Sequence, residues 1–372
     1  MKMKKMLGML LATSMFLVLV GCSNTDSGKP DTNKIGMVGP LEGDLSVYGI
    51  AVHNGVDMAI NDFNAANGTN YELIAYDTKG DNTQAVHSYN KLVDEDEVIA
   101  IVGGVVSGES IAIASASQSN QTVIISPSAT AADFAGIGPN IFRGCYTDPY
   151  QAKIVAEFSY DTLGAKTAAI LYNTGSDYAK GLTQNFTKAF EDKGGKVVIS
   201  EGYADGDVDF NTQLTKIVAS NPDVFFVPNY YQDNALISKQ AKDAGITSTI
   251  VGGDGWDGIL SSVENPDIVE DVIFVNHYSP DDQTVAALAK RYLDTYGVEV
   301  NAFGVSAYDT TTCLLKAIEE AGTHDSQDII NVLNDIQFDG VLGHMEFDDN
   351  GEPIKDLSYI TIKDGAYVTY GK

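Results

Sequence analysis

Hydroxyl-bearing residues and glycines gather at the ends of two short apolar stretches in the first half of the chain. These stretches, Val98–Val102 and Thr122–Ile125, predict β-strands, each followed by a Gly-, Ser- and Thr-rich loop that begins a helix. Ser107, Ser128 and Thr130 fall in the loops. Hydroxyls and free backbone N–H groups at a helix N-terminus suit a small anion such as a carboxylate or phosphate. The same three residues could instead serve as helix N-caps, as Ser and Thr often do.

The sequence lacks the motifs of the common enzymes that act on nucleotides or acyl groups. Gly36-Met37-Val38-Gly39-Pro40 places a proline where a dinucleotide-binding Gly-x-Gly-x-x-Gly loop needs free backbone, and neither a Walker A lysine motif nor a Gly-x-Ser-x-Gly elbow is present. The five histidines are scattered, and no Cys/His cluster has the spacing of a zinc site. We therefore expect a protein that is not an enzyme and that needs no metal or other cofactor.

The N-terminal sequence has the features of a secretory signal peptide. Three lysines precede an apolar run from Met6 to Val20, and the run ends in Leu-Val-Gly-Cys at Cys22, which resembles the lipobox of bacterial lipoproteins. An ordinary signal peptide with an incidental cysteine is the alternative. We expect a signal peptide at 1–21 and a polar, lipidated tether at 22–33. Such a protein is extracytoplasmic and anchored by lipid to the cell membrane, as on a Gram-positive surface.

Size and charge narrow the possible partners. About 350 residues follow the predicted signal, which is enough for two domains. The formal charge is −28, and about −31 without the three signal lysines, which argues against binding to nucleic acid or anionic membranes. Cys145 and Cys313 could form one disulfide, but we favour two buried free thiols.

The order of predicted elements indicates an α/β fold. Short β-branched stretches alternate with helical patterns from Ile35 to Asn276, which predicts parallel βαβ units. A single sheet with this many units would be unusually large. We therefore favour two doubly wound lobes with a hinged ligand cleft between them. Asp148-Pro149 marks a boundary, and Leu357–Lys363 with Ala366–Tyr370 predicts a C-terminal hairpin.

Several motifs together resemble the leucine/isoleucine/valine-binding protein family. They are Ile35–Leu41, the predicted helix start at Tyr48-Gly49, Ile125–Thr130, Asp223–Tyr231 and Gly252–Gly255. Members of this family are the substrate-binding components of ABC amino-acid importers and have the type I periplasmic binding protein fold. The resemblance extends from about residue 34 to the C-terminus.

The resemblance implies two doubly wound lobes joined by a three-segment hinge around a ligand cleft. The N-terminal lobe would comprise 34–148 and 278–355, and the C-terminal lobe 149–277 and 356–372. It further implies a monomer that binds a free amino acid, branched-chain or otherwise aliphatic, and delivers it to an ABC permease with its ATPase.

The resemblance also implies the two halves of an amino-acid site. The ligand carboxylate would bind the hydroxyls of Ser107 and Thr130 and the backbone N–H groups of Ser128 and Thr130. The ligand ammonium would bind Asp254 and Tyr230 from the other lobe. For Asp254 the alternative is a plain turn residue in Gly-Gly-Asp-Gly, and for Tyr230 it is the neighbouring tyrosine, Tyr231.

Aromatic residues would line the side-chain pocket. Tyr48 and Tyr178 match pocket positions of the family, while Trp256 and Tyr278 could line the pocket or pack elsewhere. Glu109 is expected to face solvent in the first turn of its helix.

An aspartate in place of the usual family glutamate leaves the preferred side chain open. A binder or sensor of another small polar metabolite, such as an amide or urea, is the alternative function.

Overall fold

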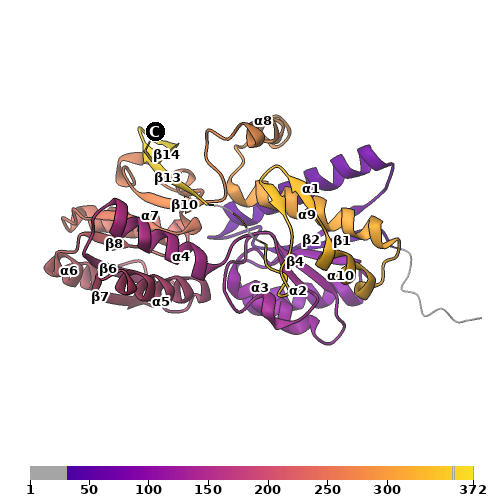
Figure 1. The fold of residues 1–372 in the computed structure, drawn as a ribbon, viewed down its shortest axis with the longest axis horizontal. Coiled ribbons are helices and arrows are strands. Elements are labelled where there is room, and N and C mark those ends of the chain that lie inside the picture. Colours follow the sequence, from indigo (N-terminus) through magenta and orange to yellow (C-terminus); the bar gives the residue numbers. More distant parts are fainter. Residues whose placement is uncertain (1–31, 354, 356, 372) are drawn as a thin grey trace, which may run out of the picture.

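Two sheets, each covered by helices, form two lobes that lie side by side (Figure 1). The structure is a computed structural model that describes residues 32–353, 355 and 357–371. The predicted signal peptide, the lipidation site at Cys22 and most of the tether lie outside these residues. Among the described helices, none combines the length and apolar character needed to cross a membrane.

The first lobe is built on a five-stranded parallel sheet of order β2-β1-β3-β4-β5. Its strands are β1 (Lys34–Gly39), β2 (Glu72–Asp77), β3 (Ala100–Gly103), β4 (Val123–Ser126) and β5 (Ile141–Arg143). Its helices from the first half of the chain are α1 (Ser46–Asn67), α2 (Asn82–Asp94) and α3 (Ser107–Ser117). The late part of the chain adds α8 (Gln283–Tyr296), α9 (Ala302–Ala321), α10 (Ser326–Asp335), β11 (Phe338–Gly340) and β12 (Gly343–Met345).

The second lobe is built on a seven-stranded sheet of order β14-β13-β10-β9-β8-β6-β7. Its strands are β6 (Thr167–Asn173), β7 (Lys196–Tyr203), β8 (Val224–Phe226), β9 (Thr249–Gly252), β10 (Ile273–Asn276), β13 (Ser358–Lys363) and β14 (Ala366–Thr369). Its helices are α4 (Asp148–Glu157), α5 (Asp177–Asp192), α6 (Asn211–Ser220) and α7 (Tyr231–Asp243). β13 pairs antiparallel with both β10 and β14, so the predicted C-terminal hairpin is confirmed.

Close packing of α1 against α9 fixes the late helices on the first lobe. An ideal Cβ added to Gly55 of α1 would lie 2.3 Å from the carbonyl oxygen of Gly304 in α9. Glycine is therefore needed here because a side chain would force the two helices apart. Helix α9 buries residues on nearly all of its faces, as a helix inside a packed domain does.

The fold corrects two expectations about local structure. No α-helix follows β4 directly: the chain forms only a 3₁₀ turn at Ala135–Ile137, because glycines and a proline interrupt the segment before β5. Helix α10 was not predicted, although Asp325 caps it and Ile329, Ile330 and Leu333 give it a buried face.

The two cysteines among the described residues, Cys145 and Cys313, are buried free thiols, as favoured from the sequence.

Candidate functional site

The predicted site residues lie at the carboxyl ends of parallel strands in both lobes. The loops after β3 and β4 carry Ser107, Ser128 and Thr130, and the loops after β8 and β9 carry Tyr230 and Asp254. Ligand sites of open parallel sheets form at such strand ends.

Ser107 is the first residue of α3, which has Val106 as its N-cap. The Ser107 hydroxyl accepts a hydrogen bond from the Ala131 N–H at 3.2 Å. This bond joins the two predicted anion-binding loops. The N-cap interpretation of Ser107 is therefore wrong, because the residue does not occupy the cap position.

Ser126, which was not predicted as part of the site, organises the loop after β4. Its hydroxyl donates to the Gly104 carbonyl at 2.7 Å and accepts from the N–H groups of Ser128 at 3.3 Å and Ala129 at 2.9 Å. The Ser128 hydroxyl donates to the Val105 carbonyl at 2.7 Å. Both loops are thus held in one rigid arrangement by short side-chain-to-backbone bonds.

Thr130 is buried beside Asp148, the first residue of α4. The Thr130 carbonyl accepts the Asp148 N–H at 2.7 Å. Neither the Thr130 hydroxyl nor Oδ2 of Asp148 has a hydrogen-bond partner within the part of the chain that the structure describes. Burial raises the pKa of Asp148 to about 8, and the hydrogen bond from Gln151 partly opposes this shift.

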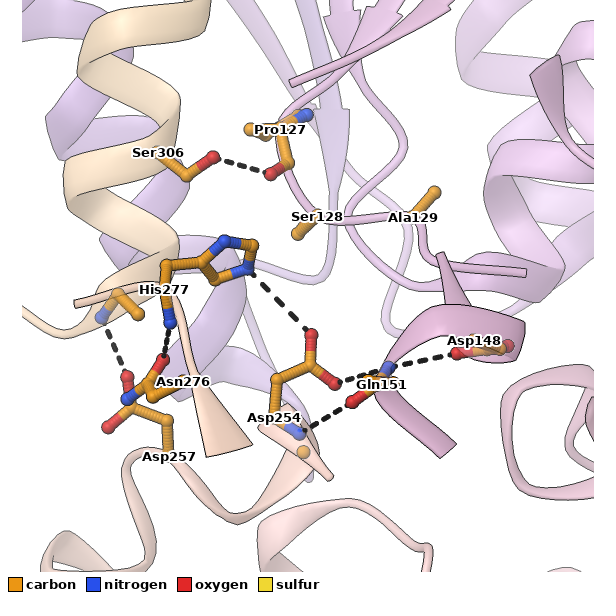
Figure 2. A network of polar contacts seen from close by, with 12 residues as sticks. Pro127, Ser128, Ala129, Asp148, Gln151, Asp254, Asp257, Asn276, His277 and Ser306 are labelled. Atoms are coloured by element: carbon orange, nitrogen blue, oxygen red, sulfur yellow. Dashed lines mark hydrogen bonds and ion pairs between the residues drawn. The ribbon is translucent and has the colours of Figure 1, made fainter. Parts of the chain in front are cut away.

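Asp254 is held by two side chains of its own lobe. Its Oδ1 accepts from the Tyr178 hydroxyl at 2.9 Å and from Nε2 of Gln151 at 3.2 Å. Figure 2 shows the contact with Gln151. The second oxygen of Asp254, Oδ2, lies 3.9 Å from Nε2 of His277. Burial raises the pKa of Asp254 to about 6, although the hydrogen bonds from Tyr178 and Gln151 lower it.

The glycines around Asp254 allow this close approach. A Cβ on Gly253 would lie 2.7 Å from Oε1 of Gln151, and one on Gly255 would lie 2.6 Å from the Asn229 carbonyl oxygen. Neither glycine has a positive φ. The glycines of Gly-Gly-Asp-Gly are therefore needed because neighbouring groups pack tightly around the carboxylate, and not only because the chain turns here.

Aromatic rings from both lobes pack against one another, and one of them, Tyr178, contacts this carboxylate. The Tyr178 and Tyr230 rings are stacked with centroids 4.8 Å apart, and Tyr48 stacks on Phe303 at 4.1 Å. Tyr48 and Tyr230 meet edge to face at 5.8 Å. Tyr231 instead donates its hydroxyl to the Asp44 carbonyl at 2.5 Å, so Tyr230 is the tyrosine of the pair that lies beside Tyr178.

The lobes touch directly at this point. The Tyr48 hydroxyl, from the first lobe, donates to the Gly255 carbonyl at 2.7 Å and accepts the Tyr231 N–H at 3.2 Å. Oδ2 of Asp257 accepts the N–H of Ala302, at the start of α9, at 2.7 Å. The structure thus shows the two lobes in contact across the cleft.

Of the other two predicted aromatic residues, Trp256 belongs to the same hydrophobic cluster as Tyr48 and Phe303, and Tyr278 belongs to another. Trp256 is fully buried beneath the strand ends and donates Nε1–H to the Val227 carbonyl at 2.8 Å. Tyr278 is half-buried and packs with a separate cluster that includes Met58 and Tyr292. Both contacts are those of core residues.

The expectation for Glu109 is wrong. Its side chain is buried and accepts a hydrogen bond from the Thr78 hydroxyl. Burial raises the pKa of Glu109 to about 7. The first turn of α3 faces the loop after β2, and this loop covers Glu109.

Sequence reasoning missed three residues of the Asp254 network, Asp148, Gln151 and His277. It also missed Phe303, which stacks on Tyr48. In the sequence, the proline after Asp148 indicates only a boundary. The one usable signal was the spacing of Asp148 and Gln151, which places them on one face of a helix at i and i+3. No group of three or more His, Cys, Asp or Glu side chains within the described ranges could hold a metal ion.

Two lobes with facing polar strand-end loops define a two-lobed solute-binding protein. Residues 32–366 match the family described as periplasmic binding protein, and the chain belongs to this family, whose relatives include Leu/Ile/Val-binding proteins. The Leu/Ile/Val-binding protein BraC3 of Rhizobium johnstonii is 30% identical over 81% of this chain and 83% of that protein.

Two solved structures are similar over nearly the whole described chain. The leucine-binding protein LivK of Thermotoga maritima has a TM-score of 0.86 and 31% identity, covering 91% of this chain and 97% of that one. The branched-chain amino acid transporter substrate-binding protein LivJ of Streptococcus pneumoniae, solved with isoleucine, has a TM-score of 0.85 and 29% identity, covering 90% and 97%. The type I fold predicted from the sequence is confirmed.

Proposed function

We propose that this protein is the extracytoplasmic substrate-binding lipoprotein of an ABC amino-acid importer. Its ligand is a free amino acid, branched-chain or otherwise aliphatic, and its partners are an ABC permease and the associated ATPase. The relatives named for leucine, isoleucine and valine support this ligand class. The N-terminal sequence supports the lipid anchor at Cys22.

One observation carries the proposal: hydroxyl-bearing residues of the first lobe and a buried carboxylate of the second both lie at the carboxyl ends of parallel strands, where the two lobes meet. Ser107 and Thr130 lie in the loops after β3 and β4, and Asp254 lies after β9. An α-amino acid is a zwitterion whose carboxylate suits the first group and whose ammonium suits the second. Tyr48, Tyr178 and Phe303 supply apolar ring surface for an aliphatic side chain.

In this mechanism the first lobe binds the carboxylate, and closure then brings Tyr230 and Asp254 to the ammonium. The ligand contacts both lobes only in the closed arrangement, so its differential affinity shifts the population toward closure. The ammonium also offsets the free-energy cost of burying the Asp254 charge, because an opposite charge favours the ionised carboxyl.

Calorimetry of the purified protein with L-leucine, L-isoleucine, L-valine, acetamide and urea tests the proposal. We expect binding of at least one amino acid and none of the amides. Asp254→Ala should weaken that binding by well over threefold, and Thr130→Val should weaken it while leaving the melting transition nearly unchanged. Tighter binding of an amide that survives Asp254→Ala would favour the alternative function.

A further inference from the structure

His277 lies beside Asp254 on the chain segment that leaves β10. Both side chains are 3% exposed, and Nε2 of His277 is 3.9 Å from Oδ2 of Asp254. In the view of Figure 2 the imidazole ring lies between the Ser128 turn and Asp254. Oδ1 of Asp254 is already bonded to Tyr178 and Gln151, so Oδ2 is the oxygen left to receive a new donor.

The separation of these two atoms suits a shared donor. At 3.9 Å, Nε2 of His277 and Oδ2 of Asp254 are too far apart to bond to each other. A single nitrogen about 2.9 Å from each atom could direct one N–H bond to each of them. An ammonium group has three N–H bonds and the charge that a buried carboxylate needs.

The His277 ring is neutral, so one of its two nitrogens has a lone pair that can accept a hydrogen bond. Burial lowers the pKa of His277 to about 3, so the ring is neutral and does not repel a cation. Tyr146 stacks on the ring at 4.2 Å with an angle of 19°, which fixes its orientation. Nδ1 has no hydrogen-bond partner among the residues that the structure describes, so the described fold does not fix which ring nitrogen carries the proton.

We propose that Nε2 of His277 is a second acceptor for the α-ammonium of the ligand, which it shares with Oδ2 of Asp254. The inference rests on the proposed amino-acid function and names a binding residue that the family resemblance did not supply. It explains how an aspartate, one methylene shorter than glutamate, can serve here: the imidazole contributes part of the coordination from the hinge side.

Matched substitutions test the role of the Nε2 lone pair. His277→Phe keeps a flat ring to stack on Tyr146 but removes the acceptor, and His277→Gln restores a side-chain acceptor. We expect the Phe variant to bind L-leucine, L-isoleucine and L-valine at least tenfold more weakly and the Gln variant to stay within about threefold of wild type. His344→Phe, at an exposed histidine paired with Asp339, is the control and should bind like wild type.

Nitrogen-15 NMR of the imidazole ring supplies a readout that needs no variant. In the leucine-bound protein we expect the His277 proton on Nδ1 and a bare Nε2; a proton on Nε2 would overturn the inference. Equal weakening in the Phe and Gln variants, or a Phe variant within twofold of wild type, would also overturn it. A wild-type protein that binds none of the twenty amino acids would instead refute the proposed function, and this inference with it.

Discussion

Gln151 holds Asp254 by both ends of its amide. Its Oε1 accepts the Asp254 backbone N–H at 3.1 Å, and its Nε2 donates to the Asp254 carboxylate at 3.2 Å. The same Nε2 also reaches Oδ1 of Asp148 at 3.0 Å. One side chain on α4 therefore fixes the position of the carboxylate that the proposed function assigns to the ligand ammonium, which makes Gln151 a positioning residue.

Replacing Gln151 by leucine keeps the side-chain volume but removes all three hydrogen bonds. We expect leucine affinity to fall about tenfold, since bonds to charged groups contribute about 1.5–3 kcal/mol each. The free energy of unfolding should fall by about 1–3 kcal/mol, because two buried carboxylates lose a donor. Calorimetry and urea unfolding measure the two effects. Gln327→Leu on the exposed face of α10 should change neither, and an unchanged affinity in Gln151→Leu would show that Asp254 does not depend on this contact.

Ligand affinity should depend on pH through Asp254. Burial raises the pKa of its carboxyl to about 6 in the ligand-free protein, and only the ionised form attracts an ammonium. Affinity should therefore rise as pH increases from 5 to 7, with a limiting slope of about tenfold per unit below the pKa. Titrations at several pH values measure this slope. Asp254→Asn should flatten the curve at a low affinity; a wild-type affinity independent of pH from 5 to 7 would contradict the assignment.

Asp148 should make the ligand-free protein less stable as pH rises. Burial raises its folded-state pKa from 3.8 to about 8, so between these values the unfolded chain has released a proton that the folded protein still holds. The unfolded state then binds fewer protons, and stability falls as pH increases through this window.

Asp148→Asn removes this titration while keeping an acceptor for Gln151. We expect the variant to have a higher free energy of unfolding than wild type, and we expect this difference to be larger at pH 8 than at pH 5. Urea unfolding at both values measures the difference. An advantage of the variant that shrinks toward pH 8 would be inconsistent with a raised pKa.

Tyr48 should favour the arrangement in which the lobes touch. Its hydroxyl is bonded to Gly255 and Tyr231 of the opposite lobe. Tyr48→Phe keeps the ring stacked on Phe303 but removes both hydrogen bonds between the lobes, so we expect ligand affinity to fall several-fold. Small-angle X-ray scattering at saturating L-leucine should show a larger fraction of open molecules; a scattering curve identical to that of wild type would rule out this role.

The strand-end residues were predictable because βαβ order alone places them. Alternating strands and helices bring Ser107, Thr130 and Asp254 to the cleft edge of their sheets, and the family resemblance then paired the two edges. By contrast, His277 lies just after the last strand of the parallel run, where its direction depends on how the chain crosses between lobes. Neither periodicity nor spacing reports that direction.

The sequence also did not predict which polar residues are buried. Glu109 has the position of an exposed helix-start acid, yet a loop from a neighbouring strand covers it. The predicted helix after β4 is absent for a local reason. The polar loop predicts a helix cap, but the residues that follow are too rich in glycine to propagate a helix. Tertiary neighbours decide the burial of Glu109, and local composition decides the missing helix.

A thermal-shift screen of the purified protein against the twenty amino acids and small amides tests the central claim most directly. We expect one or more aliphatic amino acids to raise the melting temperature, because a ligand that binds only the folded state stabilises it by mass action. We expect Asp254→Ala to abolish the shift. No stabilisation of the wild-type protein by any amino acid would contradict the proposed function.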